Sequence, residues 1–177
     1  MKSTDESKIS SELKYQKDFE IDKSISISQD EIKKLLVEKQ ERFKELDAIN
    51  KTTQILKENI SVSEMLSKIA VLLPSALQYP DHTVARIKYG NKSYTSSNKF
   101  KKTSWVLKKG FETIDGKNGT IEVYYLKKFP EADEGPFLME ERQLINNITS
   151  IASGHLNTII GKDLLKQTTK KEKEENK

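Results

Sequence analysis

The sequence predicts a mixed α/β fold of the α+β kind. One antiparallel sheet is flanked by long N-terminal and C-terminal helices. Apolar residues recur at three- and four-residue steps over 28–60 and again over 138–165, as they do along one side of a helix. Between these segments, four runs of alternating apolar and polar residues are separated by short turns. Parallel strands would need crossover connections of about a dozen residues or more, so runs this close together predict antiparallel pairing.

Residues 1–27 predict a flexible leader. The segment is rich in Ser, Lys, Asp and Glu and holds only isolated apolar residues. Such a segment buries too little apolar surface to offset the conformational entropy that is lost on ordering. The alternative is that it forms the beginning of a longer helix.

Residues 28–60 predict a long helix with a coiled-coil-like stripe. Ser28 and Glu31 have the spacing of a capping box, in which the serine caps the first turn and the glutamate reaches back. No Pro or Gly interrupts the segment, although Lys39 and Arg42 weaken the stripe. The stripe consists of Ile32, Leu35, Leu46, Ile49, Thr53, Leu56 and Ile60. Because it is long and narrow, it indicates a partner helix rather than an ordinary domain core.

A globular region is predicted over 61–165. Ser61 and Glu64 form a second capping-box pattern, and the short helix that follows has the broad apolar face of a core helix until Pro74 ends it. Strands are predicted over 83–89, 92–96, 103–114 and 120–126. The segment Asp115–Gly119 is a strong hairpin signal, because Gly and Asn accept positive φ angles.

The last helix is predicted over 138–165, followed by a charged tail over 166–177 that frays. Glu140, Glu141 and Arg142 at its start suit the helix dipole and surface ion pairs. The two long helices carry more apolar surface than one small sheet can cover. Packing both against a second copy would bury that surface in a four-helix bundle, so we expect a parallel homodimer through the N-terminal and C-terminal helices.

Composition excludes several kinds of chemistry. The chain has 177 residues, of which 34% are hydrophobic and 33% charged, and this suits one modest domain with solvated appendages. It has no cysteine and two histidines, so thiolate chemistry and cysteine zinc sites are excluded and no metal site is expected. No secretory signal or membrane-spanning run is recognisable, so a cytoplasmic location without membrane contact is expected. No P-loop or nucleophile-elbow motif occurs, so no catalytic residue is assigned and an enzyme is not expected.

Six sequence segments, taken together and in this order, carry a resemblance to a known family: Leu46–Leu56, Ser63–Ile69, Leu73–Pro80, Ala85–Tyr89, Gly119–Tyr125 and Gly135–Ile145. Together they resemble the GAF-like input domains of prokaryotic signalling proteins, such as sensor histidine kinases, over about residues 46–160. The resemblance implies a sandwich with the terminal helices on one face of the sheet, a ligand pocket on the other, and dimerisation through the helices. In those terms 28–60 is a signalling helix, 61–165 is the GAF-like domain, and the partner is a kinase or another output domain.

Departures from the family pattern narrow the choice of ligand. GAF domains that bind cyclic nucleotides carry an Asn-Lys and Phe-Asp-Glu signature, whereas Asn98-Lys99-Phe100 is followed here by Lys101 and Lys102. Covalent attachment of a bilin needs a cysteine, which the chain lacks. No cofactor is therefore predicted.

Residues 82–111 contain no Asp or Glu, and they interleave lysines and one arginine with Tyr, Phe and Trp. Cations beside aromatic rings on a sheet can bind a small anion, or a single-stranded nucleic acid by stacking and phosphate contacts. The other interpretation is that the aromatic residues form the core and the lysines are solvated. A net charge of only +4 argues against nucleic acid.

Four residues are candidates for ligand binding: Arg86, Tyr94, Trp105 and Tyr124. Arg86 lies in a predicted central strand, where it could clamp a carboxylate or phosphate or form an ion pair with Glu122 of a neighbouring strand. Trp105 could stack on a flat ligand or belong to the core. The two tyrosines could point their hydroxyls into a pocket or be partly buried with solvated hydroxyls.

The sequence therefore predicts a non-catalytic sensory or regulatory module. It would bind a small ligand, such as an anion, or a partner on its sheet, and dimeric helices would relay the change in signal transduction. Two alternatives stay open. One is a dimerising scaffold without a ligand, and the other is a weak nucleic-acid binder that uses the basic sheet.

Overall fold

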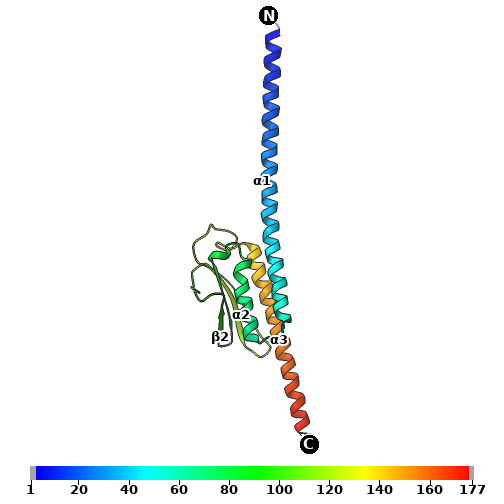
Figure 1. The fold of residues 1–177 in the computed structure, drawn as a ribbon, viewed down its shortest axis with the longest axis vertical. Coiled ribbons are helices and arrows are strands. Elements are labelled where there is room, and N and C mark those ends of the chain that lie inside the picture. The colour runs from blue at the N-terminus through cyan, green and yellow to red at the C-terminus, as the bar shows by residue number, and fades with distance from the viewer. Residues whose placement is uncertain (1–2, 176–177) are drawn as a thin grey trace. The chain divides into compact units, whose positions relative to one another are not determined.

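The computed structural model describes residues 3–175, with side chains described at residues 23, 28–171 and 174. The chain divides into two units, Met1–Gln40 and Glu41–Lys177. Over its described residues the first unit consists of the beginning of helix α1 (Ser3–Lys57). The second unit contains the end of α1 and the elements of the sheet domain (Figure 1). These are helix α2 (Val62–Leu72), the short 3-10 helices η1 (Leu73–Ala76) and η2 (Pro80–His82), strands β1 (Thr83–Tyr89), β2 (Lys92–Thr95), β3 (Val106–Glu112) and β4 (Asn118–Tyr125), and helix α3 (Met139–Glu175).

Helix α1 begins at Ser3, so the prediction of a flexible leader over 1–27 is wrong for the residues described, and the alternative of a longer helix holds. No Pro or Gly occurs before residue 74. Low hydrophobicity argues against packing but not against helical backbone bonds, which explains the error. Ser28 lies inside α1 and does not start a helix, and α1 ends at Lys57, before Ile60.

The second capping signal does start a helix. Ser61 is the N-cap of α2, and its Oγ accepts a hydrogen bond from the Glu64 amide at 3.2 Å. Helix α2 ends at Leu72, and Pro74 lies in the 3-10 turn that follows. This agrees with the predicted end of the helix, because proline cannot donate the backbone hydrogen bond that a continuing α-helix needs.

The four strands form one antiparallel sheet in the order β2-β1-β4-β3, as the closely spaced runs predict. The β3–β4 hairpin is closed by a hydrogen bond of 2.9 Å from the Thr113 amide to the Lys117 carbonyl, and Gly116 has a φ of 78°. Strand β3 begins at Val106 rather than at residue 103. Thr103 instead uses its hydroxyl to donate to the Tyr125 carbonyl at 2.7 Å.

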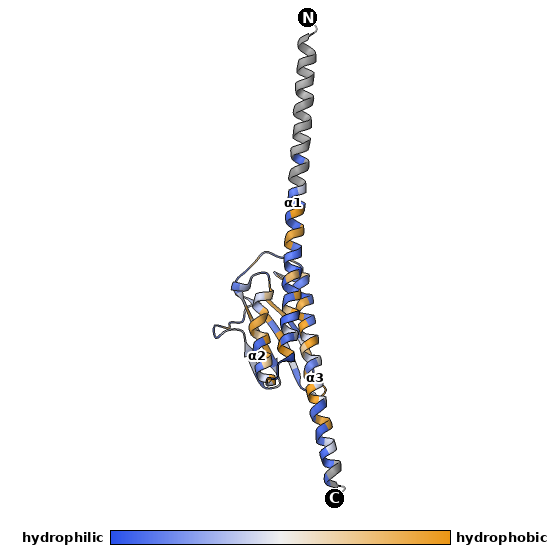
Figure 2. Cartoon of the chain, turned by 45° about the vertical axis from the view of Figure 1, so that its right-hand side comes forward, coloured by the Kyte–Doolittle hydropathy of each residue, from blue (hydrophilic) through white to orange (hydrophobic). Residues whose placement is uncertain are grey.

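Helices cover one face of this sheet. Helix α2 packs against β1 and β2, α3 packs against β3 and β4, and the end of α1 runs beside α3 (Figures 1 and 2). The core lies between the two layers. It includes Ala48, Leu66, Ile69, Ile87, Leu107, Ile121, Val123, Ile145, Ile148 and Leu156.

Helix α3 extends to Glu175, well beyond the predicted end at residue 165. The predicted charged tail, 166–177, is therefore helical over its described residues. Its polar composition again fails to predict the backbone, because lysine, glutamate and glutamine are good helix formers.

Candidate ligand-binding face

Alternation along the central strands gives the sheet two different faces. Ala85 and Ile87 of β1 point toward the helices, on what we call the inner face. Arg86 and Lys88 therefore point to the opposite side. This outer face also carries Val84, Lys108, Thr120, Glu122 and Tyr124, as the strand register requires.

An ion pair lies at the centre of the outer face. Arg86 and Glu122 are directly opposite each other on β1 and β4. Glu122 Oε2 accepts hydrogen bonds from Arg86 Nε at 2.8 Å and from Nη2 at 2.5 Å. The Tyr124 hydroxyl donates to the same oxygen at 2.7 Å and accepts a longer bond, of 3.3 Å, from Arg86 Nη2. Of the two interpretations of Arg86, the ion pair with Glu122 is confirmed.

The second carboxylate oxygen of Glu122 is held more loosely. Its only ion-pair partner in the described part of the chain is Lys88 Nζ, at 3.2 Å, and the Lys88 side chain is about half exposed. Lys108 on β3 is directly opposite Glu122 on the other side and is exposed. Three cations therefore surround one carboxylate, and the outer face keeps an excess of positive charge.

Burial and hydrogen bonding act in opposite directions on this carboxylate. Glu122 is only 6% exposed, and burial, the largest single effect, raises its pKa. Hydrogen bonds from Tyr124, Arg86 and Lys88 together outweigh burial, so the net pKa of Glu122 is lowered. Burial and the bond to Glu122 raise the pKa of Tyr124 to about 12. Glu122 is therefore an anion and Tyr124 a neutral donor at neutral pH.

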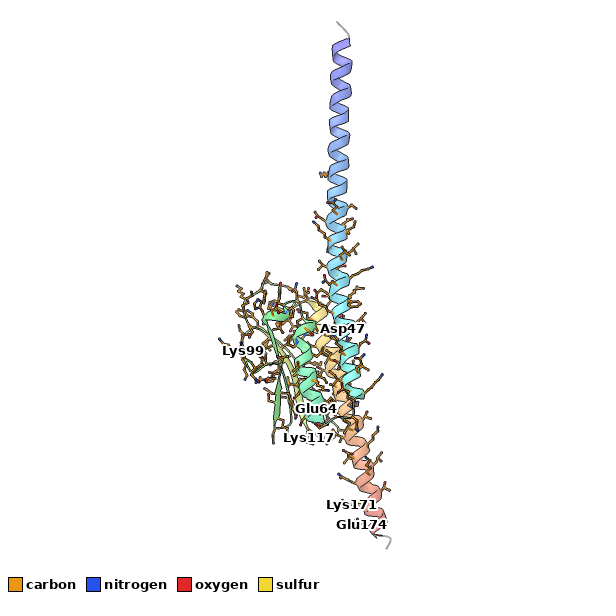
Figure 3. The ribbon with its side chains drawn as sticks, in the orientation of Figure 1. Asp47, Glu64, Lys99, Lys117, Lys171 and Glu174 are labelled. Carbon is orange, nitrogen blue, oxygen red and sulfur yellow. The ribbon has the colours of Figure 1, made fainter. Side chains whose placement is uncertain are left out.

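The segment between β2 and β3 covers one end of the outer face. The Phe100 ring lies 5.0 Å from the Arg86 guanidinium and packs edge-on to the Tyr124 ring, with 5.5 Å between the ring centroids. Lys99, next to Phe100, lies on the side of the sheet away from α1 and α3 (Figure 3). The sequence marks this segment only by its lysines, and nothing in its pattern predicts that Phe100 covers Arg86.

The four candidate residues do not form one site. Arg86 and Tyr124 meet on the outer face, whereas Tyr94 is opposite Ile87 and so belongs to the inner face. Its hydroxyl is 3.1 Å from the Ser63 hydroxyl of α2. Trp105, which directly precedes β3, is partly buried and packs against the core, in line with the second of its two predicted interpretations. Alternation within single strands does not separate the two pairs, because the separation depends on the strand register.

Tyr94 instead borders a shallow hollow of about 300 Å³ where α2 begins and the β1–β2 turn lies. Ser63, Asn91 and Lys92 are among its other lining residues. Lys117 also borders it, but its ammonium group is held by Asp115 at 2.5 Å. The hollow is open and none of its lining residues is buried, so it lacks the enclosed polar groups that fix a ligand.

Metal binding and membrane insertion are two further possibilities to consider for the described residues. Within them, no cluster of three or more His, Cys, Asp or Glu residues is placed to hold a metal ion. None of the helices, over the range described, has a stretch both long and apolar enough to cross a membrane.

Comparison with protein-family models and with curated proteins finds no match for this chain. The GAF-like resemblance thus stays a prediction.

Proposed function

We propose that the chain is a non-catalytic sensory or regulatory module of the GAF-like kind. The outer face of its sheet binds a small ligand or a partner, and dimeric helices relay the change to a kinase or another output domain. The observation that carries this proposal is a second apolar surface on the two long helices that carry the sheet. In α1, Phe43 and Leu46 are 74% and 60% exposed, and Leu165 of α3 is 70% exposed.

The apolar surface favours a homodimer because the same helices already bury their other side in the core. Ala48 and Leu56 of α1 and Ile145 and Ile148 of α3 are buried. A single copy leaves the second side in water, at a cost that grows with the apolar area exposed. In the first unit, Ile32 and Leu35 of the predicted stripe are exposed too, whereas Ile49 and Leu56 of the same stripe pack in the chain's own core.

Analytical ultracentrifugation at micromolar concentration tests the dimer. We expect the wild-type chain to be dimeric and the double variant Phe43→Glu/Leu46→Glu to have a dissociation constant raised about a hundredfold or more, because two buried apolar contacts of about 1.5 kcal/mol or more are lost. Val71→Glu is the matched control, because Val71 is as exposed as Leu46 but lies on α2. A monomeric wild type, or equal dissociation in both variants, would contradict the proposal.

The sensory part is tested separately by a thermal-shift screen of small metabolites, rich in anions, at fixed protein concentration. A ligand that binds only the folded state raises the melting temperature as its concentration exceeds the dissociation constant. We expect hits whose effect is lost in Arg86→Gln. A dimer without any hit would instead favour the scaffold function, and salt-sensitive binding of single strands would favour nucleic acid.

A further inference from the structure

We propose that Glu122 is an internal occupant of an anion-binding cradle, and that a small oxyanion, either a carboxylate or a phosphate, displaces it from Arg86 toward Lys108. This inference rests on the proposed function, because it assigns the ligand class and the switching step of the same outer face. Its two states differ in which cation holds the Glu122 carboxylate.

The contacts of Glu122 are those a carboxylate ligand would make. Two guanidinium N–H groups of Arg86 and the Tyr124 hydroxyl all donate to Oε2, and Lys88 approaches Oε1. Arginine with lysine and a hydroxyl donor is a common combination for binding carboxylates and phosphates. Here the anion comes from the chain's own strand β4.

The strand register gives Glu122 a second place to go. On β4 it lies between Arg86 of β1 and Lys108 of β3, and both are its direct cross-strand neighbours. Directly opposite residues in an antiparallel pair have Cβ atoms about 4.5–5.5 Å apart, so a carboxylate can reach either neighbour by changing its rotamer. At present it uses Arg86, and Lys108 forms no ion pair within the described part of the chain.

The charge balance favours the exchange. Arg86, Lys88 and Lys108 carry three positive charges against the single negative charge of Glu122. An oxyanion on Arg86 and Lys88, with Glu122 on Lys108, would give each of these three cations an anionic neighbour. The exposed half of the Lys88 side chain gives access from the end of the face that Phe100 does not cover.

Such an exchange makes a bistable element out of a fixed sheet. Strand β4 continues from Glu122 through Tyr124 to Tyr125, and the Tyr125 hydroxyl donates to Glu141 at the start of α3 at 2.5 Å. A rearrangement around Glu122 and Tyr124 is therefore one residue from a direct contact with a long helix. Differential affinity of the ligand for the two arrangements is what would shift the population.

Titration calorimetry with inorganic phosphate, and separately with acetate, tests this inference at constant ionic strength set with chloride. Glu122→Gln removes the competing charge. It is expected to bind at least one of these anions about tenfold more tightly than the wild type, since a nearby like charge changes an ionic equilibrium constant by about tenfold or more. Lys108→Gln removes the alternative partner and is expected to weaken binding several-fold. The phosphate and acetate arms distinguish the two ligand classes.

Lys109→Gln is the matched control, because it removes the same charge from the next residue of β3, which is opposite Ile121 rather than Glu122. We expect it to bind as the wild type does. The Arg86 Nε–H signal in nitrogen-15 NMR spectra, assigned with Arg86→Lys, is expected to move on binding, because that group now donates to Glu122. Circular dichroism establishes that each variant is folded.

Two results would overturn the inference. One is a folded Glu122→Gln variant that binds neither anion more tightly than the wild type, and the other is equal binding by Lys108→Gln and Lys109→Gln. Either result with an intact dimer removes the exchange and leaves the proposed regulatory function. If a monomeric chain bound anions and its variants behaved as expected, the exchange would be supported and the dimer of the proposed function would be contradicted.

Discussion

The two faces of strand β4 each bury a glutamate, and they do so in different ways. On the outer face, Glu122 is surrounded by Arg86 and Lys88, and its pKa is lowered. On the helix side, Glu141 of α3 is 3% exposed and accepts hydrogen bonds, and it forms no ion pair within the part of the chain that the structure describes. Its Oε1 accepts from the Gln78 amide and the Tyr125 hydroxyl, and its Oε2 accepts from the Leu138 amide at 2.8 Å.

The difference separates an electrostatic site from a structural one. Burial, the dominant effect, raises the pKa of Glu141, and its hydrogen bonds only partly oppose this. Glu41 of α1 adds a further small rise, because it places a like charge nearby. Glu141 ties the start of α3 to β4 and to the segment before η2, whereas Glu122 lies among cations that could hold another anion. Only the outer face therefore has charge to offer a ligand.

The largest expected effect comes from removing the cation from the outer pair. Arg86→Met leaves Glu122 buried without its guanidinium partner, and it is expected to lower the free energy of unfolding by about 3 kcal/mol. The double variant Arg86→Met/Glu122→Met removes both charges and is expected to recover most of that loss, since replacing a buried ion pair by apolar groups is often neutral. Urea unfolding at neutral pH and fixed protein concentration measures both.

If the double variant were as unstable as Arg86→Met, the unpaired charge of Glu122 would not be the cause of the lost stability. Fixed concentration matters because the stability of a dimer depends on it.

Neighbouring tyrosines provide a closer comparison. Tyr124 and Tyr125 point to opposite faces, and each donates its hydroxyl to the glutamate of its own face. We expect Tyr125→Phe to cost about 2 kcal/mol, because Glu141 loses a hydrogen bond and has no ion-pair partner among the described residues to compensate for it. Tyr124→Phe is expected to cost about 1 kcal/mol or less, since Arg86 still donates twice to Glu122.

Urea unfolding of the two single variants measures this difference. Equal losses would mean that the cations around Glu122 do not compensate for its lost hydroxyl donor, which would weaken the distinction between the faces.

The sequence predicts the outer site better than the inner one. Arg86 and Glu122 are polar residues in apolar strands, and a cross-strand ion pair follows from strand alternation once the strands are recognised. Glu141, by contrast, follows Met139 and Glu140 at a helix start, where acidic residues usually face solvent. Its burial depends on how the loop before α3 and the end of β4 meet the helix, and that is tertiary information. The surface ion pair predicted for this helix start is formed by Arg142 with Glu134 instead.

Secondary structure shows a similar division. The β1 strand agrees with its predicted range, because alternation and the Gly90 turn are local signals. The ends of α1 and α3 do not agree, because a polar composition does not by itself prevent a helical backbone. The split of Arg86 and Tyr124 from Tyr94 and Trp105 needed the strand register, which single runs do not contain.

The smallest expected effect is the pH dependence of the unfolding free energy. It is also the most specific effect, because its sign differs between the two glutamates. The pKa of Glu122 is lowered in the folded state, so its stabilising contribution is present above the ordinary value of 4.5 and is lost as the pH falls from there through the folded pKa. The pKa of Glu141 is raised, so its favourable contribution is present below 4.5 and is lost as the pH rises through the folded pKa. Unfolding free energies of the wild type are compared with those of Glu122→Gln and Glu141→Gln between about pH 4 and about pH 7. The wild-type advantage over Glu122→Gln should grow with pH over the acidic part of this range, and the advantage over Glu141→Gln should shrink. If both differences changed in the same direction, the contrast between a cation-held and a cation-free carboxylate would be lost.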